Sequence, residues 1–167
     1  MKQRILCTVL LVLGLAGTLA AQTKISGTLS CGKPDPAYKI DVADRPGHSI
    51  MLAQFACTWT KPMEIEGLQT KDGVDVGTDD GSGTKLHGNG YHYSNMSNGD
   101  KIFVHFSGTD TMTKDGKPVG NAGTWSFTGG TGKLKGITGK GSYKGSATAE
   151  GTMVTDVEGE YQLPAAK

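Results

Sequence analysis

The sequence is poor in large apolar side chains and in long stretches without glycine or proline. Leu, Ile, Val and Phe make up only about 16% of residues 22–167, a proportion that indicates disorder when the net charge is high. The formal net charge at pH 7 is only +1, and the apolar residues recur with a clear period. We therefore expect a folded domain with a thin core.

Ordinary helices are excluded over most of the chain. The 167 residues include 26 glycines and 6 prolines, and both residue types weaken helix interiors. After the first 21 residues, the longest stretch without either one is 48–61. Leu52, Phe55 and Trp59 in this stretch have helical spacing, but its odd-numbered residues also alternate as in a strand. The strand formers that follow Cys57 favour the strand.

A long apolar run is also absent. The first such run, residues 5–16, follows Lys2 and Arg4 and is too short for a membrane span of about 20 apolar residues. A basic start, a short apolar run and small residues before position 22 predict a secretory signal peptide over residues 1–21. We expect residues 22–167 to form a single exported domain, periplasmic or extracellular, without a membrane span.

Charge of one sign does not dominate the chain, which has 17 basic and 16 acidic residues. Such a chain has no overall field to attract nucleic acid, so we predict no nucleic-acid partner. The charges are unevenly placed, because residues 64–80 are mostly acidic and residues 111–145 carry lysines and one acid, Asp115. These segments either pair between subunits or form solvated loops, and the sequence leaves both readings open.

Cysteine is rare, and its positions suggest one bridge. Of three cysteines, Cys7 lies within the predicted signal peptide, which leaves Cys31 and Cys57 in the exported domain. An even pair in an oxidising compartment predicts a disulfide. The alternative is two buried free thiols.

Alternating apolar and polar residues predict strands in most of the chain. Trp125 and Phe127 share one parity, and Val157 and Tyr161 share another such row. Phe103 lies on the opposite parity from its apolar neighbours, which predicts a strand covered on both faces. We expect eight strands, near residues 24–31, 48–60, 63–69, 85–95, 101–111, 121–128, 134–144 and 147–163.

Turn signals separate these predicted strands. Asn98-Gly99 and Asp115-Gly116 are typical of tight hairpins, and residues 78–83 form another turn cluster. An antiparallel chain of this size must close or stack its sheets to protect their edges. The predicted fold class is therefore all-β, a closed antiparallel barrel of about eight strands.

Motifs for nucleotides, serine nucleophiles and metals are missing. The glycine-rich segment 129–136 is not a phosphate loop, because Leu134 follows Lys133 and Phe127 replaces the first glycine. No serine has the Gly-x-Ser-x-Gly setting. Four histidines and four aspartates lack the spacing of known metal sites; they are His48, His87, His92, His105, Asp72, Asp75, Asp79 and Asp80. We predict no cofactor and no metal.

The most suggestive cluster combines aromatic and ionisable side chains. The predicted ligand-binding residues are Trp59, Tyr91, His92, Tyr93 and His105. At a barrel mouth such groups can hold a small ring system, and His92, His105 or Glu64 can act as acid or base on it. Alternatively, the tyrosines are half-buried strand residues whose hydroxyl groups reach water.

Residues 123–137, Gly-Thr-Trp-Ser-Phe-Thr-Gly-Gly-Thr-Gly-Lys-Leu-Lys-Gly-Ile, resemble the dirigent and allene oxide cyclase-like β-barrel superfamily. In that superfamily a Gly-Gly-Thr-Gly-Lys turn joins two late strands. The resemblance covers residues 103–161, and the earlier part is similar to uncharacterised exported bacterial relatives. It implies a calycin-like or allene oxide cyclase-like barrel with an apolar cavity, often a homo-trimer, in a group that guides or catalyses cyclisation and coupling of lipophilic molecules.

The shared segment is a turn, so it argues for shape and not for a reaction. The leading hypothesis is an exported barrel that binds a small apolar molecule without covalent chemistry. The second is an isomerase or cyclase of the allene oxide cyclase or dirigent type. The third is a structural or interaction protein of the envelope. The sequence leaves open whether the protein is an enzyme.

Overall fold

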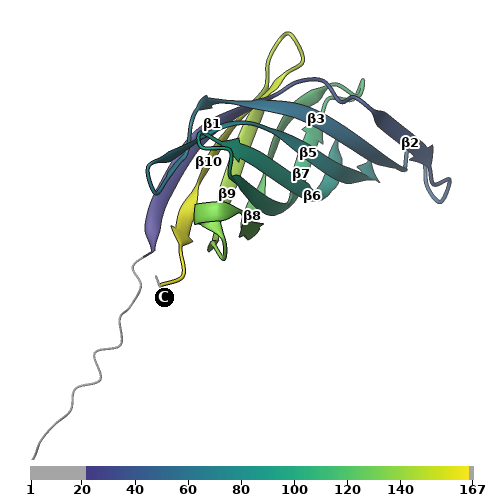
Figure 1. Ribbon diagram of the computed structural model, residues 1–167. Coiled ribbons are helices and arrows are strands. Elements are labelled where there is room, and N and C mark those ends of the chain that lie inside the picture. The colour runs from purple at the N-terminus through teal and green to yellow at the C-terminus, as the bar shows by residue number, and fades with distance from the viewer. Residues whose placement is uncertain (1–21, 166–167) are drawn as a thin grey trace, which may run out of the picture.

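Eight long strands form a closed antiparallel barrel around a shared interior, as the sequence predicts (Figure 1). The computed structural model describes residues 22–165, so the predicted signal peptide lies outside the described residues. The barrel strands are β1 (Thr23–Cys31), β3 (Ser49–Lys61), β5 (Leu68–Ser82), β6 (Lys85–Met96), β7 (Lys101–Met112), β8 (Pro118–Gly130), β9 (Thr138–Ala147) and β10 (Met153–Gln162). The short strands β2 (Ala37–Asp41) and β4 (Glu64–Ile65) and the 3-10 helix η1 (Gly132–Leu134) complete the elements.

Closure of the barrel depends on β3. Neighbouring strands follow the order β3-β1-β10-β9-β8-β7-β6-β5, and β3 pairs again with β5 to complete the ring. One edge of β3 pairs with β5 over residues 49–58, while the other pairs with β2 over residues 49–53 and with β1 at residues 57–61. Closure gives every barrel strand two neighbours, which is how all-β chains protect their sheet edges. The strand predicted over residues 48–60 is thus confirmed.

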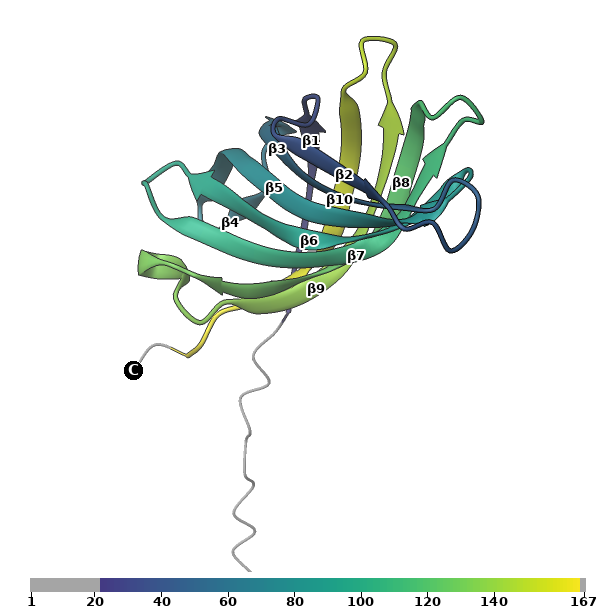
Figure 2. The same ribbon diagram turned by 90° about the vertical axis from the view of Figure 1, so that its right-hand side faces the viewer.

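The two ends of the barrel differ. One end is packed with apolar side chains, where β4, the turn into β5 and η1 bury Ile65, Leu68, Met96, Ile102 and Leu134. The β9–β10 turn projects from the opposite end (Figure 2). The packed end closes the barrel, so any internal space is expected toward the other end.

Alternate residues along each strand face the interior. Trp125, Phe127 and Tyr161 are all buried, which confirms the predicted inward rows on β8 and β10. Phe103 is 37% exposed on the outer face of β7. The expectation that this strand is covered on both faces is therefore wrong, because only the inner face of a barrel strand meets the core.

The largest difference from the sequence prediction is β5. The strand expected over residues 63–69 is interrupted by a turn, in which Glu66 and Gly67 have φ of 52° and 73°. β5 then runs through residues 78–82, where the sequence predicted a turn. Its inward positions alternate between glycine and aspartate: Gly73, Asp75, Gly77, Asp79 and Gly81. Since no apolar residue marks this inner face after Leu68, the period of two was hidden.

Three other boundaries also differ. β2 was not predicted, and all five of its residues are exposed. β9 and β10 begin later than expected, at Thr138 and Met153. Leu134 and Ile137 are buried by the η1 turn and not by a strand, so their apolar character misled the prediction of where β9 starts.

Interior aromatic rings lie over glycines of adjacent strands. A Cβ added at Gly90 would lie 2.7 Å from Phe106 Cζ, and one added at Gly123 would lie 2.5 Å from the Tyr143 hydroxyl oxygen. Glycine permits this close approach and lets the sheet curve. Part of the high glycine content thus makes room for large rings inside the barrel.

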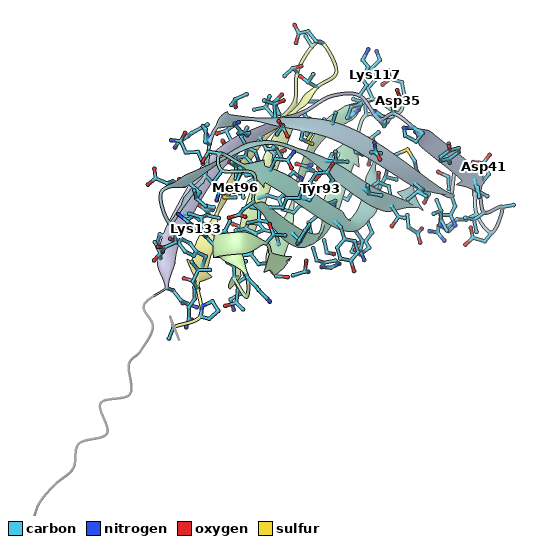
Figure 3. The ribbon with its side chains drawn as sticks, in the orientation of Figure 1. Asp35, Asp41, Tyr93, Met96, Lys117 and Lys133 are labelled. Atoms are coloured by element: carbon cyan, nitrogen blue, oxygen red, sulfur yellow. A yellow bond between two sulfur atoms is a disulfide. The ribbon has the colours of Figure 1, made fainter. Side chains whose placement is uncertain are left out.

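Cys31 and Cys57 form the predicted disulfide (Figure 3). The two residues stand opposite each other in the β1–β3 pairing, which comprises four residue pairs. This is the shortest seam between barrel strands, so the bridge joins the ring where its backbone pairing is weakest.

None of the helical segments in residues 22–165 has the length and hydropathy of a membrane span.

Candidate functional site

The barrel encloses a cavity of about 410 Å³. Aromatic rings from four strands form much of its wall, and these are Phe55, Trp59, Phe106, Trp125 and Tyr143. Met51, Met63, Met112 and Met153 add flexible apolar surface. The cavity reaches the loop residues Pro34, Gly116 and Gly151, so it extends toward the end of the barrel opposite the one packed with apolar side chains.

Asp79 on β5 and Asp110 on β7 form a pair of carboxyl groups at the cavity wall. They approach each other across β6 at Gly88, where an added Cβ would lie 2.5 Å from Asp110 Oδ2 and 3.1 Å from Asp79 Oδ1. Burial and the Asp79 charge raise the pKa of Asp110 to about 7, and burial also raises the pKa of Asp79. Two carboxyl groups this close hold one proton between them over a wide pH range. The pair can therefore donate and accept a hydrogen bond at the same time.

A second set of polar side chains, Asp75, His92, Ser94 and Trp59, forms a hydrogen-bond network across the interior. His92 Nδ1 lies 2.6 Å from Asp75 Oδ1, and His92 Nε2 lies 2.6 Å from Ser94 Oγ. Trp59 Nε1 donates to Ser94 Oγ over 2.8 Å. In the neutral tautomer, Nδ1 donates to Asp75 and Nε2 accepts from the serine hydroxyl, so every polar atom of the network has a partner.

The hydrogen bonds from Asp75 to His92 to Ser94 have the order of a serine hydrolase triad, but the serine is not accessible to a substrate. Ser94 is 0% exposed, and Trp59 covers its hydroxyl group. A nucleophile must reach the substrate carbonyl, so the burial of Ser94 argues against acyl transfer. The network instead fixes the ring of His92, which lines the cavity together with Asp75.

The remaining polar lining residues are neutral. Burial, followed by the charge of Asp110, raises the pKa of the Tyr143 phenol, so this group stays protonated as a hydrogen-bond donor. Asn121, opposite Asp110 in the β7–β8 pairing, has a buried side-chain oxygen without a hydrogen-bond partner among the described residues. Such an acceptor is costly unless a donor reaches it.

Carboxyl groups dominate the ionisable lining of the cavity. Asp75, Asp79 and Asp110 line it, whereas no lysine or arginine of residues 22–165 does. His92 is hydrogen-bonded to Asp75, whereas no basic side chain of the described residues pairs with Asp79 or Asp110. The interior is therefore an apolar space with an acidic wall.

Cys31, Cys57 and Asp75 are the described residues whose ligand atoms lie close enough for a metal. The two sulfur atoms are bonded to each other, and a metal takes thiolate and not disulfide sulfur. These residues therefore do not fit a metal ion, and Asp75 instead contacts the disulfide, with Oδ2 at 3.6 Å and 3.7 Å from the two sulfurs.

The structure separates the predicted ligand-binding residues into two groups. Trp59 and His92 line the cavity. Tyr91, 61% exposed, contacts His105 with ring centroids 5.1 Å apart on the outer face. Tyr93 also lies on the outer side of β6, near the end of the strand, where Lys101 Nζ is 5.0 Å from its ring centroid. Adjacent residues of a strand face opposite sides, so His92 cannot share a pocket with its two tyrosine neighbours.

The other acid–base candidates are also outside the cavity. Glu64 is exposed on β4. His105 Nε2 donates one hydrogen bond, at 2.9 Å, to Asn89 Oδ1 on the outer face. It borders a hollow of about 1010 Å³ over β7, β8, β9, β10 and β1, where Lys24 and Glu160 form an ion pair of 2.9 Å. Charges on that surface are matched, unlike those inside the barrel.

Sequence reasoning missed the acidic wall. Asp75 and Asp79 were considered only as calcium ligands, and Asp110 and Tyr143 were not considered. The available signal was the alternation of aspartate with glycine from Gly73 to Gly81, which has the period of a strand. It was hidden because inward carboxylates are rare in sheets.

Comparisons with known proteins add one finding. No family model matches the sequence, and no curated protein matches it. Among solved structures, the chain is similar to the pterocarpan synthase dirigent protein GePTS1, with 12% identical residues, a TM-score of 0.49 and 88% of each chain covered. At this identity the likeness concerns overall shape, and the barrel assignment rests on the strand pairings of the chain itself.

Proposed function

We propose that this protein binds a small, mostly apolar molecule non-covalently inside its barrel. The observation that carries the proposal is the cavity of about 410 Å³ with aromatic and methionine walls. Pockets for small molecules have about 300–1,000 Å³, mainly apolar walls and a few placed polar groups. The acid pair and the Asp75–His92 pair supply those polar groups.

Fluorescence with the apolar dye N-phenyl-1-naphthylamine tests this function. Val157 lines the cavity and Val154 is 37% exposed on the other face of the same strand, β10. Val157→Phe narrows the cavity, and we expect it to weaken dye binding about tenfold, whereas Val154→Phe leaves binding unchanged. Absence of dye binding to the wild-type protein, with no mass above that of the protein in native mass spectrometry, would contradict the proposal.

A second candidate function is acid–base catalysis on a lipophilic substrate, as in an isomerase or cyclase. The observation that favours it is the carboxyl group of Asp110, which has a pKa of about 7 and lies beside the Asp79 carboxyl at the cavity wall. A carboxylate that takes a proton from carbon, next to a carboxylic acid that donates to the carbonyl oxygen, is an effective arrangement near neutral pH.

Exchange of the α-protons of 2-tetralone in D₂O tests this second function. We expect the wild-type protein to accelerate exchange above the buffer rate, and Asp110→Asn to remove the acceleration. His105→Asn and Glu64→Gln, which alter groups outside the cavity, should retain it. Exchange at the buffer rate with wild-type protein, under conditions where 2-tetralone binds, would exclude the catalytic role.

Export belongs to the same proposal. A disulfide on a chain with a predicted signal peptide agrees with an oxidising compartment. A homo-oligomer, a trimer by resemblance, is a further part of it. Analytical ultracentrifugation in low and high salt distinguishes a monomer from an assembly held by the acidic and lysine-rich segments.

A further inference from the structure

We infer that the barrel is selective for lipophilic amines, whose protonated nitrogen lies against the Asp79–Asp110 pair while the apolar body fills the aromatic cavity. This inference rests on the proposed binding function and names the class of ligand. It depends on two separate features of the cavity: the sign of its charges and the chemistry of its walls.

The sign of the charges excludes anionic ligands. Asp75, Asp79 and Asp110 line the cavity, and no lysine or arginine of the described residues lines it. His92 is already paired with Asp75. A carboxylate or phosphate ligand would therefore meet uncompensated negative charge in a partly desolvated space, where repulsion is weakly screened. A cation would instead gain the two carboxyl groups as partners.

The walls themselves favour a cation with an apolar body. Phe106, Trp125 and Tyr143 line the same space as the acid pair. A positive charge near the face of an aromatic ring is attracted by its negative electron density, and rings with carboxylates are a known arrangement for ammonium groups. The methionines adapt to the shape of the apolar portion.

The number of hydrogen-bond donors distinguishes an amine from an alcohol at the acid pair. The buried side-chain oxygen of Asn121 has no donor among residues 22–165, but it lies over Gly145 of β9, where an added Cβ would be 2.2 Å from it, on the side of β8 away from Asp110. An ammonium group carries up to three donors. One ligand nitrogen at the acid pair has enough donors for both carboxyl groups, whereas a hydroxyl group has one.

The same geometry gives a pH dependence. The other titratable groups that line the cavity are Tyr143 on β9, which lies within range of the Asp110 and Asp79 charges, and Asp75 on β5 and His92 on β6, which are hydrogen-bonded to each other. As pH rises through the pKa of Asp110 the pair gains negative charge, so the affinity for an amine rises. Affinity for a neutral analogue has no such dependence, because its binding does not change the charge of the pair.

Isothermal titration with three naphthalene probes tests the inference. The probes are 1-naphthylmethylamine, 1-naphthylmethanol and 1-naphthoate, which share an apolar body and differ in charge. At about pH 8 we expect the amine to bind the wild-type protein at least about tenfold more tightly than the alcohol, and the naphthoate most weakly. The advantage of the amine should shrink as pH falls to about 5.

Asp79→Asn/Asp110→Asn removes the charge and keeps similar volume. We expect this variant to bind the amine and the alcohol equally, with unchanged affinity for the alcohol, which also shows that it is folded. Asp156→Asn, on the outer face, is the matched control and should retain the preference. Equal binding of amine and alcohol to wild-type protein, or preference for naphthoate, overturns the inference alone. Failure of all three probes to bind overturns the proposed function as well.

Discussion

Two inward aspartates make the interior sensitive to pH. Burial and the nearby Asp79 charge raise the pKa of Asp110 to about 7 in the folded protein, against about 3.9 for an unperturbed aspartate. Between these values the folded state binds more protons than the unfolded state, so stability falls as pH rises. The contribution is complete below the unfolded pKa and is lost as pH rises through the folded pKa.

The corresponding prediction concerns Asp110→Asn. The amide cannot ionise, so we expect the variant to be more stable than wild type at about pH 8 by about 1–3 kcal/mol, and to have no such advantage at about pH 4. Urea denaturation at both pH values measures the difference. Asp156→Asn serves as control, and an advantage that is the same at both pH values would show that Asp110 does not titrate in this range.

Ser94 is the residue on which the other interior network depends. Its hydroxyl group accepts a hydrogen bond from Trp59 Nε1 and is hydrogen-bonded to His92 Nε2, and the residue is 0% exposed. Ser94→Ala leaves two buried polar groups without partners, so we expect a loss of about 1–3 kcal/mol in the free energy of unfolding. Ser142→Ala, on the outer face, is expected to change it by less than about 0.5 kcal/mol. Equal losses for the two variants would contradict the role assigned to the network.

At the scale of elements, the seam between β1 and β3 has the fewest pairs, and a disulfide bridges it. The bridge joins residues 26 positions apart, and closing a loop of that size stabilises a domain by about 3–4 kcal/mol on the chain-entropy model. We expect Cys31→Ser/Cys57→Ser to lose about this much in urea denaturation. Asp75 lies beside the bridge, so the new hydroxyl groups have an acceptor. A change below about 1 kcal/mol would show that the backbone pairing alone holds the seam.

The β2–β3 loop is tied to β5 by one histidine. His48 is hydrogen-bonded to Asp44 in the loop and to Asp80 on β5 at 2.7 Å, and these bonds, that to Asp80 first, raise its pKa. The stabilisation is therefore present below the unfolded pKa of about 6.5 and is lost as pH rises through the folded value. We expect protection of residues 42–48 against amide exchange to fall over this range. The variant His48→Asn should show no such fall, and a fall in both proteins would contradict the assignment.

The elements show where sequence reasoning succeeds. Strands with an apolar inner face, such as β8 with Trp125 and Phe127, can be recognised in the sequence by apolar residues at every second position. β5 carries glycine and aspartate inward, so its inner face has the composition of a turn. The same choice of residues builds the acid pair, and the part of the fold that was hardest to predict is therefore part of the candidate site.

At the scale of the whole molecule, the need to protect sheet edges was enough to predict a closed barrel. Which side chains share the interior depends on register across strands, and sequence spacing alone does not supply it. Tyr91 and His105 do meet, but on the outer face. Asp79 and Asp110 meet inside because Gly88 leaves room between them, a contact of residues 31 positions apart that no local pattern predicts.

The central claim is that the barrel is hollow and admits a ligand beside the acid pair. The most direct measurement is a crystal structure of residues 22–167 grown with 4-bromobenzylamine, in which anomalous scattering locates the bromine. The account predicts a bromine peak among Trp59, Phe106 and Trp125, with the amine nitrogen in hydrogen-bond contact with Asp79 or Asp110. An interior filled by the protein's own side chains, without a bromine peak, would contradict it.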